Sequence, residues 1–592
     1  MTLSTTDLIR VGRLDELAEP RVVSGGRHGI AVFLSDGTPY AVDNRCPHMG
    51  FPLQRGSVCD GILTCHWHHA RFDLASGGTF DPFADDVRTY ETVVEDGVVY
   101  VSPRPRPLDL ERHWKRRLRE GLEQNLSLVL IKAVLGLREA EVPERDVVAI
   151  GGRFGAAYRQ AGWGPGLTIL TAMANVLPAL ERTDAALALY HGLVHVSRDA
   201  LNEPPRFQQE PLPERGTPLP RLKTWFRQFV EVRDGVGAER ALLSAIDSGA
   251  SPAELMDILF AAATDHVFLD GGHTLDFINK AGELLDRVGW EQARDILPSV
   301  VPGLAMARRS EELNNWRHPV DLVRLIEPAI ARLPELTERA RAGDWDDFDV
   351  LAETLLGDEP EAIVDGLVAA LEAGAALTQL SQVLSYAAAL RVARFHTSNE
   401  FSDWITVLHT FTAANALHQG LQRSPSPELA RGLFHGAARL YLDRFLNMPA
   451  ARLPERRNAE GQPTDAAELL GKLTDLLDRE QQVNEAALVV HRYLSLGYER
   501  APLIATLGMT LVREDAEFHS YQMLEAGLAL EGELREVRPE AANRALVAIA
   551  RYLAAHAPTS RAMLQTARTA MRLQRGEAVY EDAEELAEVA DA

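Results

Sequence analysis

Apolar and polar positions follow different rules in the two parts of the chain. Up to about residue 104, short apolar runs with alternating polar positions end at turn residues, among them Asp36-Gly37 and Asp96-Gly97. Asp-Gly between two apolar runs is typical of a tight β-hairpin. From about Leu110 onward, apolar residues recur at spacings of three and four, which is the period of an amphipathic helix. The pattern therefore predicts a multidomain protein with an all-β domain over residues 1–104 and a large all-helical domain over residues 105–592.

Prolines mark the change of pattern and several helix starts. The segment Ser102–Asp109 contains three prolines, which predicts a stiff, extended linker. In the helical part, Ser251-Pro252 and Ser426-Pro427 each place a capping hydroxyl directly before a proline, as at the first turn of a helix. The longest apolar run, Leu126–Leu137, is broken by Lys132 and is too short to cross a bilayer.

Charge and cysteine usage exclude several classes of protein. The net charge of −24 disfavours binding to nucleic acid and to anionic membrane surfaces, so we expect neither as a partner. The polar N-terminus has no apolar signal segment, and the chain contains only three cysteines. These features predict a cytoplasmic protein without a disulfide framework.

The three cysteines lie close together, and two of them alternate with histidines. Sixteen residues separate Cys46-Pro47-His48 from Cys65-His66-Trp67-His68. Two thiolates and two imidazoles form a complete ligand set for tetrahedral zinc. Against zinc, each half supplies one Cys and one His from a Gly- and Pro-rich loop after a strand-like segment. Zinc remains the alternative to an iron–sulfur centre on the residues alone.

The flanks of both motifs extend the match. "CPHMGFPLQRG" and "CHWHHARFDLASG" resemble the two ligand loops of the Rieske iron–sulfur family, and the resemblance spans about residues 5–104. It implies a small antiparallel β fold that carries a [2Fe–2S] cluster and transfers electrons. It also implies that Cys46 and Cys65 hold one iron and that His48 and His68 hold the other.

Details of the loops indicate the type of Rieske centre. High-potential members carry an extra disulfide-forming cysteine in each loop, and Ser and Tyr hydroxyls that donate to sulfur. Here the matching positions are Phe51, Trp67, Ala70 and Phe72. Fewer donors to sulfur lower the potential, so we predict a low-potential, ferredoxin-type centre. Of the other residues near the motif, we expect Cys59 to be a small buried hydrophobe, and His66 and His69 to be exposed and not ligands.

The helical part contains histidines at positions typical of metal sites in helix bundles. They lie in apolar segments with carboxylates such as Glu517 and Glu525 nearby. Single helical histidines are usually core or surface residues, so the pattern alone leaves both interpretations open. The candidate ligands are His191 and His195, spaced four apart on one helix, together with His273, His409 and His519.

A second family is similar over short motifs between residues 165 and 535. The spacing of the histidine segments, including "LHTFTAANAL" around His409, resembles the all-helical questin-oxidase-like family. The resemblance implies a mononuclear non-haem iron that uses O2 to oxidise an organic, aromatic substrate. The chain departs from the family at Gln522, where the family has a metal-binding lysine. Glu517, Glu525 or Lys280 would then supply the missing ligand, although an exposed position for Lys280 is the ordinary expectation.

Together these features predict an iron–sulfur oxidoreductase. A low-potential Rieske cluster relays electrons to a non-haem metal in the helical domain, where an organic substrate is oxidised. No dinucleotide-binding motif follows a strand in residues 1–104, so a separate reductase or ferredoxin must supply the electrons. The alternatives are a ferredoxin-like electron carrier whose helical half is a docking or scaffold module, and a redox sensor without turnover.

Overall fold

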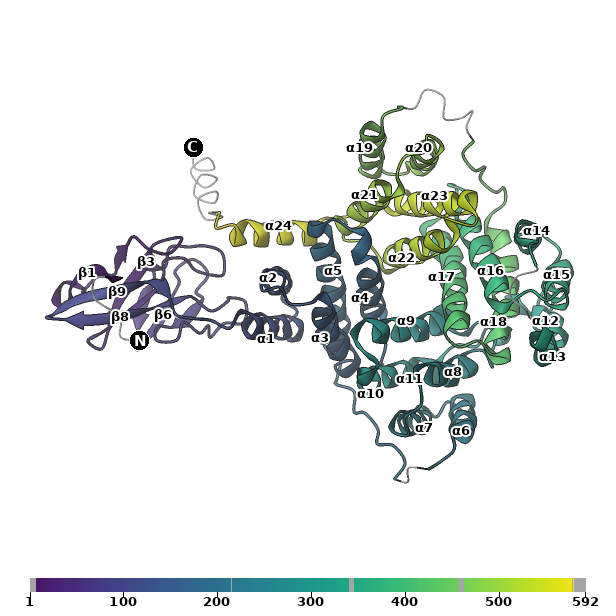
Figure 1. Ribbon diagram of the computed structural model, residues 1–592, viewed down its shortest axis with the longest axis horizontal. Coiled ribbons are helices and arrows are strands. Elements are labelled where there is room, and N and C mark those ends of the chain that lie inside the picture. The colour runs from purple at the N-terminus through teal and green to yellow at the C-terminus, as the bar shows by residue number, and fades with distance from the viewer. Residues whose placement is uncertain (1–6, 214–215, 340–344, 456–462, 578, 580–592) are drawn as a thin grey trace. The chain divides into compact units, whose positions relative to one another are not determined.

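A β-sheet region precedes a large helical region in this protein. The computed structural model describes the chain except residues 1–6, 214–215, 340–344, 456–462, 578 and 580–592. The described strands lie between Ile9 and Pro105, and the α-helices between Leu110 and Gln574 (Figure 1). This confirms the predicted fold class.

The elements form two compact units. The first contains the described residues of Met1–Val147 and Ala562–Ala592, and the second contains those of Val148–Arg561. The first unit therefore includes the whole β region and several helices. The boundary at residue 104, predicted from the change of pattern, stays a prediction.

The β region contains two antiparallel sheets. The larger has six strands in the order β1-β9-β8-β4-β3-β2, and the smaller has the order β5-β6-β7. Strands β3 and β4 pair from Ile30 opposite Asp43 to Ser35 opposite Thr38. The strand bounds are β1 (Ile9–Arg13), β2 (Arg21–Val23), β3 (Ile30–Ser35), β4 (Thr38–Asp43), β5 (Ser57–Cys59), β6 (Ile62–Thr64), β7 (Arg71–Asp73), β8 (Thr89–Glu95) and β9 (Val98–Pro105).

Asp-Gly pairs close the hairpins as predicted. Asp36-Gly37 joins β3 to β4 and Asp96-Gly97 joins β8 to β9, and all four residues have positive φ. Two successive residues with positive φ give the turn that matches the twist of paired strands. A third pair, Asp60-Gly61, does the same between β5 and β6. The predicted linker is partly strand, because β9 continues through Ser102–Pro105.

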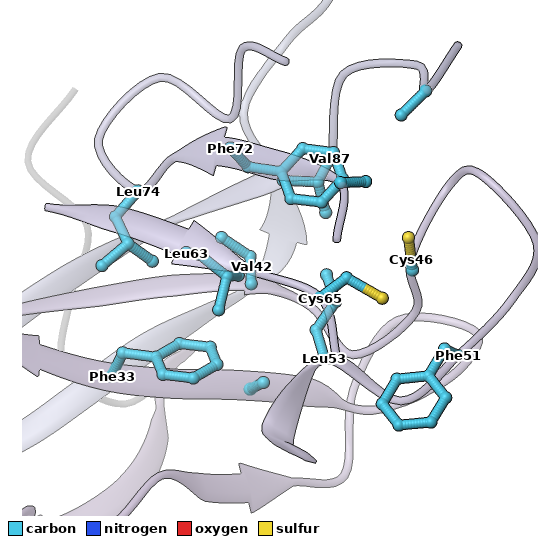
Figure 2. Packing of buried hydrophobic residues seen from close by; sticks show 13 residues of the cluster. Phe33, Val42, Cys46, Phe51, Leu53, Leu63, Cys65, Phe72, Leu74 and Val87 are labelled. Carbon is cyan, nitrogen blue, oxygen red and sulfur yellow. The ribbon is translucent and has the colours of Figure 1, made fainter. Parts of the chain in front are cut away.

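Both faces of the larger sheet are covered. Along β3, Ala31 and Phe33 belong to one buried cluster, whereas Ile30 and Val32 belong to another. This alternation follows from the opposite directions of successive side chains on a strand. The first cluster joins the larger sheet to β6 and β7 of the smaller one and also contains both motif cysteines (Figure 2). The motif loops are therefore attached to the core between the two sheets.

Helices complete the first unit. Helices α1 (Leu110–Glu123), α2 (Ser127–Glu139) and α24 (Ala562–Gln574) belong to it, and α3 (Glu144–Ala157) begins in it. Eight of the thirteen residues of α2 are buried, among them Lys132. A helix this apolar must be covered by other elements, and α1 and α24 both pack against it.

All regular elements described in the second unit are helices. Ser251 and Ser426 cap α8 and α18 through their hydroxyls, which confirms the two predicted helix starts. No helix in the described part of the chain has the length and apolar character needed to cross a membrane. The remaining α-helices are α4 (Pro165–Val176), α5 (Arg182–Ala200), α6 (Leu219–Glu231), α7 (Gly235–Asp247), α8 (Pro252–Ala263), α9 (His273–Val288), α10 (Ala293–Ile296), α11 (Val301–Met306), α12 (Leu322–Ala331), α13 (Leu333–Arg339), α14 (Phe348–Leu355), α15 (Pro360–Glu372), α16 (Leu377–Ala393), α17 (Phe401–Arg423), α18 (Pro427–Asp443), α19 (Ala466–Leu477), α20 (Val483–Ser495), α21 (Arg500–Val512), α22 (Phe518–Leu534) and α23 (Pro539–His556).

Candidate metal centres

The two motif loops of the β region have the same backbone construction. Cys46 follows strand β4, and its N–H donates to the carbonyl of Phe51 at 2.7 Å. Cys65 follows β6, and its N–H donates to the carbonyl of Ala70 at 2.8 Å. In each loop the residue four positions after the cysteine donates back to the cysteine carbonyl. That residue has positive φ, with 93° at Gly50 and 59° at His69. Each loop therefore returns tightly on itself and keeps its cysteine at the edge of the core.

The motif side chains form two pairs, one of cysteines and one of histidines. Figure 2 shows the side chains of Cys46 and Cys65 on neighbouring loops. Their thiols share a hydrogen bond, which raises the pKa of Cys46 and lowers that of Cys65 to about 6. The rings of His48 and His68 lie 4.9 Å apart between centroids. Each pair thus takes one side chain from each of the two loops.

His48 and His68 differ in their surroundings. His48 is half-buried against the ring of Phe83, and its Nδ1 is buried without a hydrogen-bond partner among the described residues. Burial and then the positive charge of Lys132 lower the pKa of His48 to about 4, which keeps the ring neutral. His68 is exposed. A buried, neutral nitrogen without a protein partner is in the state that metal ligation requires.

The structure settles the minor expectations around the motif. His66 and His69 are exposed, as predicted. Cys59 is also exposed, so the expectation that it packs as a buried hydrophobe is wrong. Its position on the short strand β5 explains the difference, because alternate side chains of that strand point outward.

A small β domain with two such loops is a fold that holds a metal centre between loop tips. The family model of the Rieske [2Fe-2S] domain matches residues 7–91. The ferredoxin component of the p-cumate 2,3-dioxygenase system of Pseudomonas putida is 30% identical over 112 residues, which are 18% of this chain and 95% of that protein. Through this domain the chain belongs to the Rieske [2Fe–2S] family, and its cofactor is a [2Fe–2S] Rieske cluster.

Two further comparisons cover a similar share of the chain. Apoptosis-inducing factor 3 of Homo sapiens is 31% identical over 101 residues, and the chain spans only 17% of the length of that protein. Among solved structures, the ferredoxin of carbazole 1,9a-dioxygenase from Nocardioides aromaticivorans IC177 is 27% identical. The match covers 16% of this chain and 98% of the ferredoxin, with a TM-score of 0.16. These three matches each cover between 16% and 18% of this chain.

A second group of candidate ligands lies in the helical unit. His273, His409 and His519 each offer a ring nitrogen within 4.8 Å of the other two. Nε2 of His409 lies 2.8 Å from Nε2 of His519. Two imidazole nitrogens this close must share either a proton or a cation. Burial, and then the charge of the neighbouring rings, lowers the pKa of His273 to about 4 and that of His409 to about 2. These rings are therefore neutral near pH 7, as metal ligands are.

Local backbone features bring the three rings together. His273 is the first residue of α9 and His519 the second of α22, whereas His409 lies within α17. Gly272 has φ of 102°, and a Cβ at this position would lie 2.9 Å from the Cβ of Ala413. A glycine is therefore needed for the turn before α9 to approach α17 this closely. The positive end of α9 also disfavours protonation of His273.

Glu517 orients one of the three rings. Its carboxylate accepts from the backbone N–H of His519 at 2.7 Å and lies 2.8 Å from its Nδ1. Burial acts to raise the pKa of Glu517, but the bonds from His519 outweigh burial and hold it below the ordinary value. If Nδ1 donates to this carboxylate, Nε2 has a free lone pair directed at His409. Glu517 therefore acts as the carboxylate partner of a candidate metal-binding histidine.

The structure does not bring His191 and His195 into this group. His191 has Nε2 2.9 Å from the carbonyl of Val512 and Nδ1 2.6 Å from the Tyr521 hydroxyl, so both of its nitrogens are occupied. His195 packs its ring against the same tyrosine. Of the five predicted histidines, the structure therefore brings three together. Spacing on one helix shows which residues share a face, but not which face meets the other ligands.

Two of the three residues predicted to supply the missing ligand, Lys280 and Glu525, belong to a separate buried cluster. Lys280 is 1% exposed, so the expectation of an exposed lysine is wrong. Its ammonium donates to Glu525 at 2.6 Å and to Glu283 at 2.8 Å. Gln522, which stands at the lysine position of the similar family, donates to Asp276. Glu525 therefore pairs with Lys280 and is not part of the histidine group.

Asp276 gives this cluster a pH dependence that can be measured. Burial raises its pKa to about 7 from an ordinary 3.8, although Lys280 opposes the shift. Between these two pKa values, the folded state keeps a proton that the unfolded state loses. The resulting contribution to the free energy of unfolding is fully present below about pH 4. It is lost as pH rises to about 7, at up to ~1.4 kcal/mol per unit. We expect Asp276→Asn to remove this loss, so that its urea midpoint falls less between pH 4 and pH 7 than that of wild type.

Asp475→Asn, at an exposed position on α19, is the matched control and should keep the wild-type dependence. The midpoints can be followed by circular dichroism of the helices. The same pH dependence in Asp276→Asn and wild type would show that Asp276 does not titrate in this range.

Proposed function

We propose that Cys46, His48, Cys65 and His68 hold the [2Fe–2S] cluster, with the cysteines on one iron and the histidines on the other. The assignment is supported by the two matched loops, the adjacent thiols and the neutral, unpartnered Nδ1 of His48. When bound, the cluster supplies one electron at a time at a potential set by its ligands and their hydrogen bonds. The exposed ring of His68 offers the edge at which an electron donor reaches the site.

The loops also support a low-potential centre. Ala70 and Phe72 are both buried in the cluster of apolar residues that contains the two cysteines. Neither side chain has a hydroxyl that could donate to a sulfur. A cluster with fewer donors to its sulfurs is harder to reduce. We therefore infer the ferredoxin type rather than the high-potential respiratory type.

We further propose that His273, His409 and His519 bind a non-haem iron that receives these electrons and uses them, with O2, to oxidise an organic substrate. The observation that carries this proposal is the convergence of three ring nitrogens within 4.8 Å, two of them on rings held neutral by burial. Three imidazoles leave coordination positions open, as chemistry at a metal requires. The rings of Phe277 and Phe518 lie beside His273, at 5.4 and 5.8 Å between centroids, and offer an apolar surface to an aromatic substrate.

The overall reaction would consume O2, two electrons and two protons, insert one oxygen atom into the substrate and release the other as water. The chain's own residues hold the metal, keep the ligand nitrogens unprotonated and present an apolar wall. The electrons come from a separate reductase or ferredoxin. The relative from Pseudomonas putida is itself a ferredoxin component of a dioxygenase system.

The alternative is an electron carrier whose helical half is a docking or scaffold module. It is favoured by the same relative, because a ferredoxin component passes electrons on to a separate oxygenase. The two proposals differ in the number of metal centres per chain, which can be measured directly.

Substitution of the cluster ligands tests the first part. Cys46→Ser and His48→Ala should abolish the EPR signal of the reduced Rieske cluster, because each removes one of four ligands. Cys59→Ser is the matched control and should retain the signal, since Cys59 is exposed outside the motif. Retention of the normal signal in Cys46→Ser would refute the ligand assignment.

Iron content tests the second part. Fully loaded wild-type protein should contain about three irons per chain, two from the cluster and one at the histidine group. His409→Ala should contain about two and keep an unchanged Rieske EPR signal. His396→Ala, a histidine of the same unit outside the group, should keep all three. Two irons in fully loaded wild type would support the carrier alternative instead.

Glu517 provides a graded test. Glu517→Gln leaves the three rings in place but removes the carboxylate that orients His519, so iron affinity should fall about 10- to 100-fold. Titration of apo-protein with Fe²⁺ under anaerobic conditions measures the affinity. An unchanged affinity would mean that His519 does not need this partner to bind.

A further inference from the structure

A buried lysine from helix α2 contacts the loop that carries Cys46 and His48. The ammonium of Lys132 donates to the carbonyl of Pro47 at 2.6 Å and to that of His48 at 2.9 Å. Lys132 is only 8% exposed. A charge this deeply buried is stable only with close partners, and here two of those partners belong to the ligand loop.

A buried carboxylate lies on the other side of the ammonium. Asp85 is 6% exposed, and its Oδ2 lies 3.2 Å from Nζ of Lys132. Burial acts to raise the pKa of Asp85, but Lys132 and Arg117 outweigh it and hold the pKa below the ordinary value. Asp85 is therefore ionised at neutral pH. Arg117, with no exposed surface, donates to its second oxygen at 3.1 Å.

The network of Lys132, Asp85 and Arg117 also helps to position Phe83, whose ring contacts His48. Arg117 also donates to the carbonyl of Pro82 at 2.6 Å. The next residue, Phe83, places its ring 5.0 Å from that of His48 between centroids. The segment Pro82–Asp85 is thus held by α1 and α2, and its Phe83 packs against His48.

Fixed charges at this position must act on any redox centre held by the loop. Reduction adds one negative charge to the centre, so a nearby cation stabilises the reduced form and raises the potential. A nearby anion lowers the potential by the same reasoning. Both effects are strong where water is excluded, because the effective dielectric constant is low.

We propose that Lys132 and Asp85 set the reduction potential of the Rieske cluster, with the ammonium raising it and the carboxylate lowering it. Lys132 is thus a positioning and tuning residue supplied by a helix outside the β sheets. It provides a positive charge and donates two hydrogen bonds to the loop that carries Cys46 and His48. Ala70 and Phe72, by contrast, have no hydroxyl that could donate to a sulfur. This inference rests on the proposed assignment of Cys46 and His48 as cluster ligands.

The test is the midpoint potential of the cluster in the full-length chain, followed by its EPR signal during a redox titration. Lys132→Met keeps the length of the side chain and removes the charge, so its potential should be lower than that of wild type. Asp85→Asn removes the opposing charge, so its potential should be higher. Lys132→Arg keeps the charge and should lie closer to wild type than Lys132→Met.

Lys115→Met is the matched control, because it removes the same charge from the same unit. The ammonium of Lys115 pairs with Glu111 on α1 and with Asp146 on α3. Its variant should have the wild-type potential. Opposite shifts in the two test variants cannot come from a general loosening of the loop, which would move both potentials in one direction.

Shifts of the same sign in Lys132→Met and Asp85→Asn, or a Lys132→Met potential equal to that of the Lys115→Met control, would overturn the proposal. If Lys132→Met fails to retain the cluster, Asp85→Asn still decides, since an unchanged or lowered potential there contradicts it. Failure of the ligand assignment has a different signature, which is an intact Rieske signal in Cys46→Ser or His48→Ala.

Discussion

The hydrogen bonds from the buried ammonium of Lys132 to the carbonyls of Pro47 and His48 tie a helix to the ligand loop of the β domain. A charge can be kept out of water only where its partners are fixed, so this contact constrains everything around it. Helix α2 must lie against the loop, Asp85 must face the ammonium, and Arg117 of α1 must balance the carboxylate. The β sheets, α1 and α2 therefore belong to one compact unit rather than to a free-standing ferredoxin with a tail.

The same requirement distinguishes His191 from the group of three histidines in the helical unit. His191 has a protein partner for each nitrogen, a carbonyl on one side and a hydroxyl on the other. Nothing is left for a metal to bind. In the group of His273, His409 and His519, ring nitrogens face one another instead, and Glu517 takes the far nitrogen of one ring. In a well-packed core, each buried ring nitrogen has a carbonyl or hydroxyl partner. In a candidate metal site, buried ring nitrogens face one another instead.

These contrasts explain what the sequence could and could not predict. The hairpins at Asp36-Gly37 and Asp96-Gly97 and the cluster motif depend on residues close together in the chain, so local patterns were sufficient. The choice of His273 over His191 depends on which helix faces meet, and no single helix contains that information. A lysine is usually exposed, but Lys280 is buried because two glutamates from different helices pair with its ammonium. Lys132 and Asp85 are 47 residues apart in the sequence. The position of Lys132 within an apolar run was the only sequence feature that pointed to their contact.

The central claim is that electrons leave the Rieske cluster for a metal held by the three histidines. The most direct measurement follows the EPR signal of the fully reduced, iron-loaded protein after rapid mixing with O2 and freezing at successive times. In wild type and in His396→Ala the signal should decay faster than in His409→Ala, because only the latter lacks the acceptor. Equal decay in all three proteins would contradict the account and leave the cluster as a carrier for a partner outside this chain.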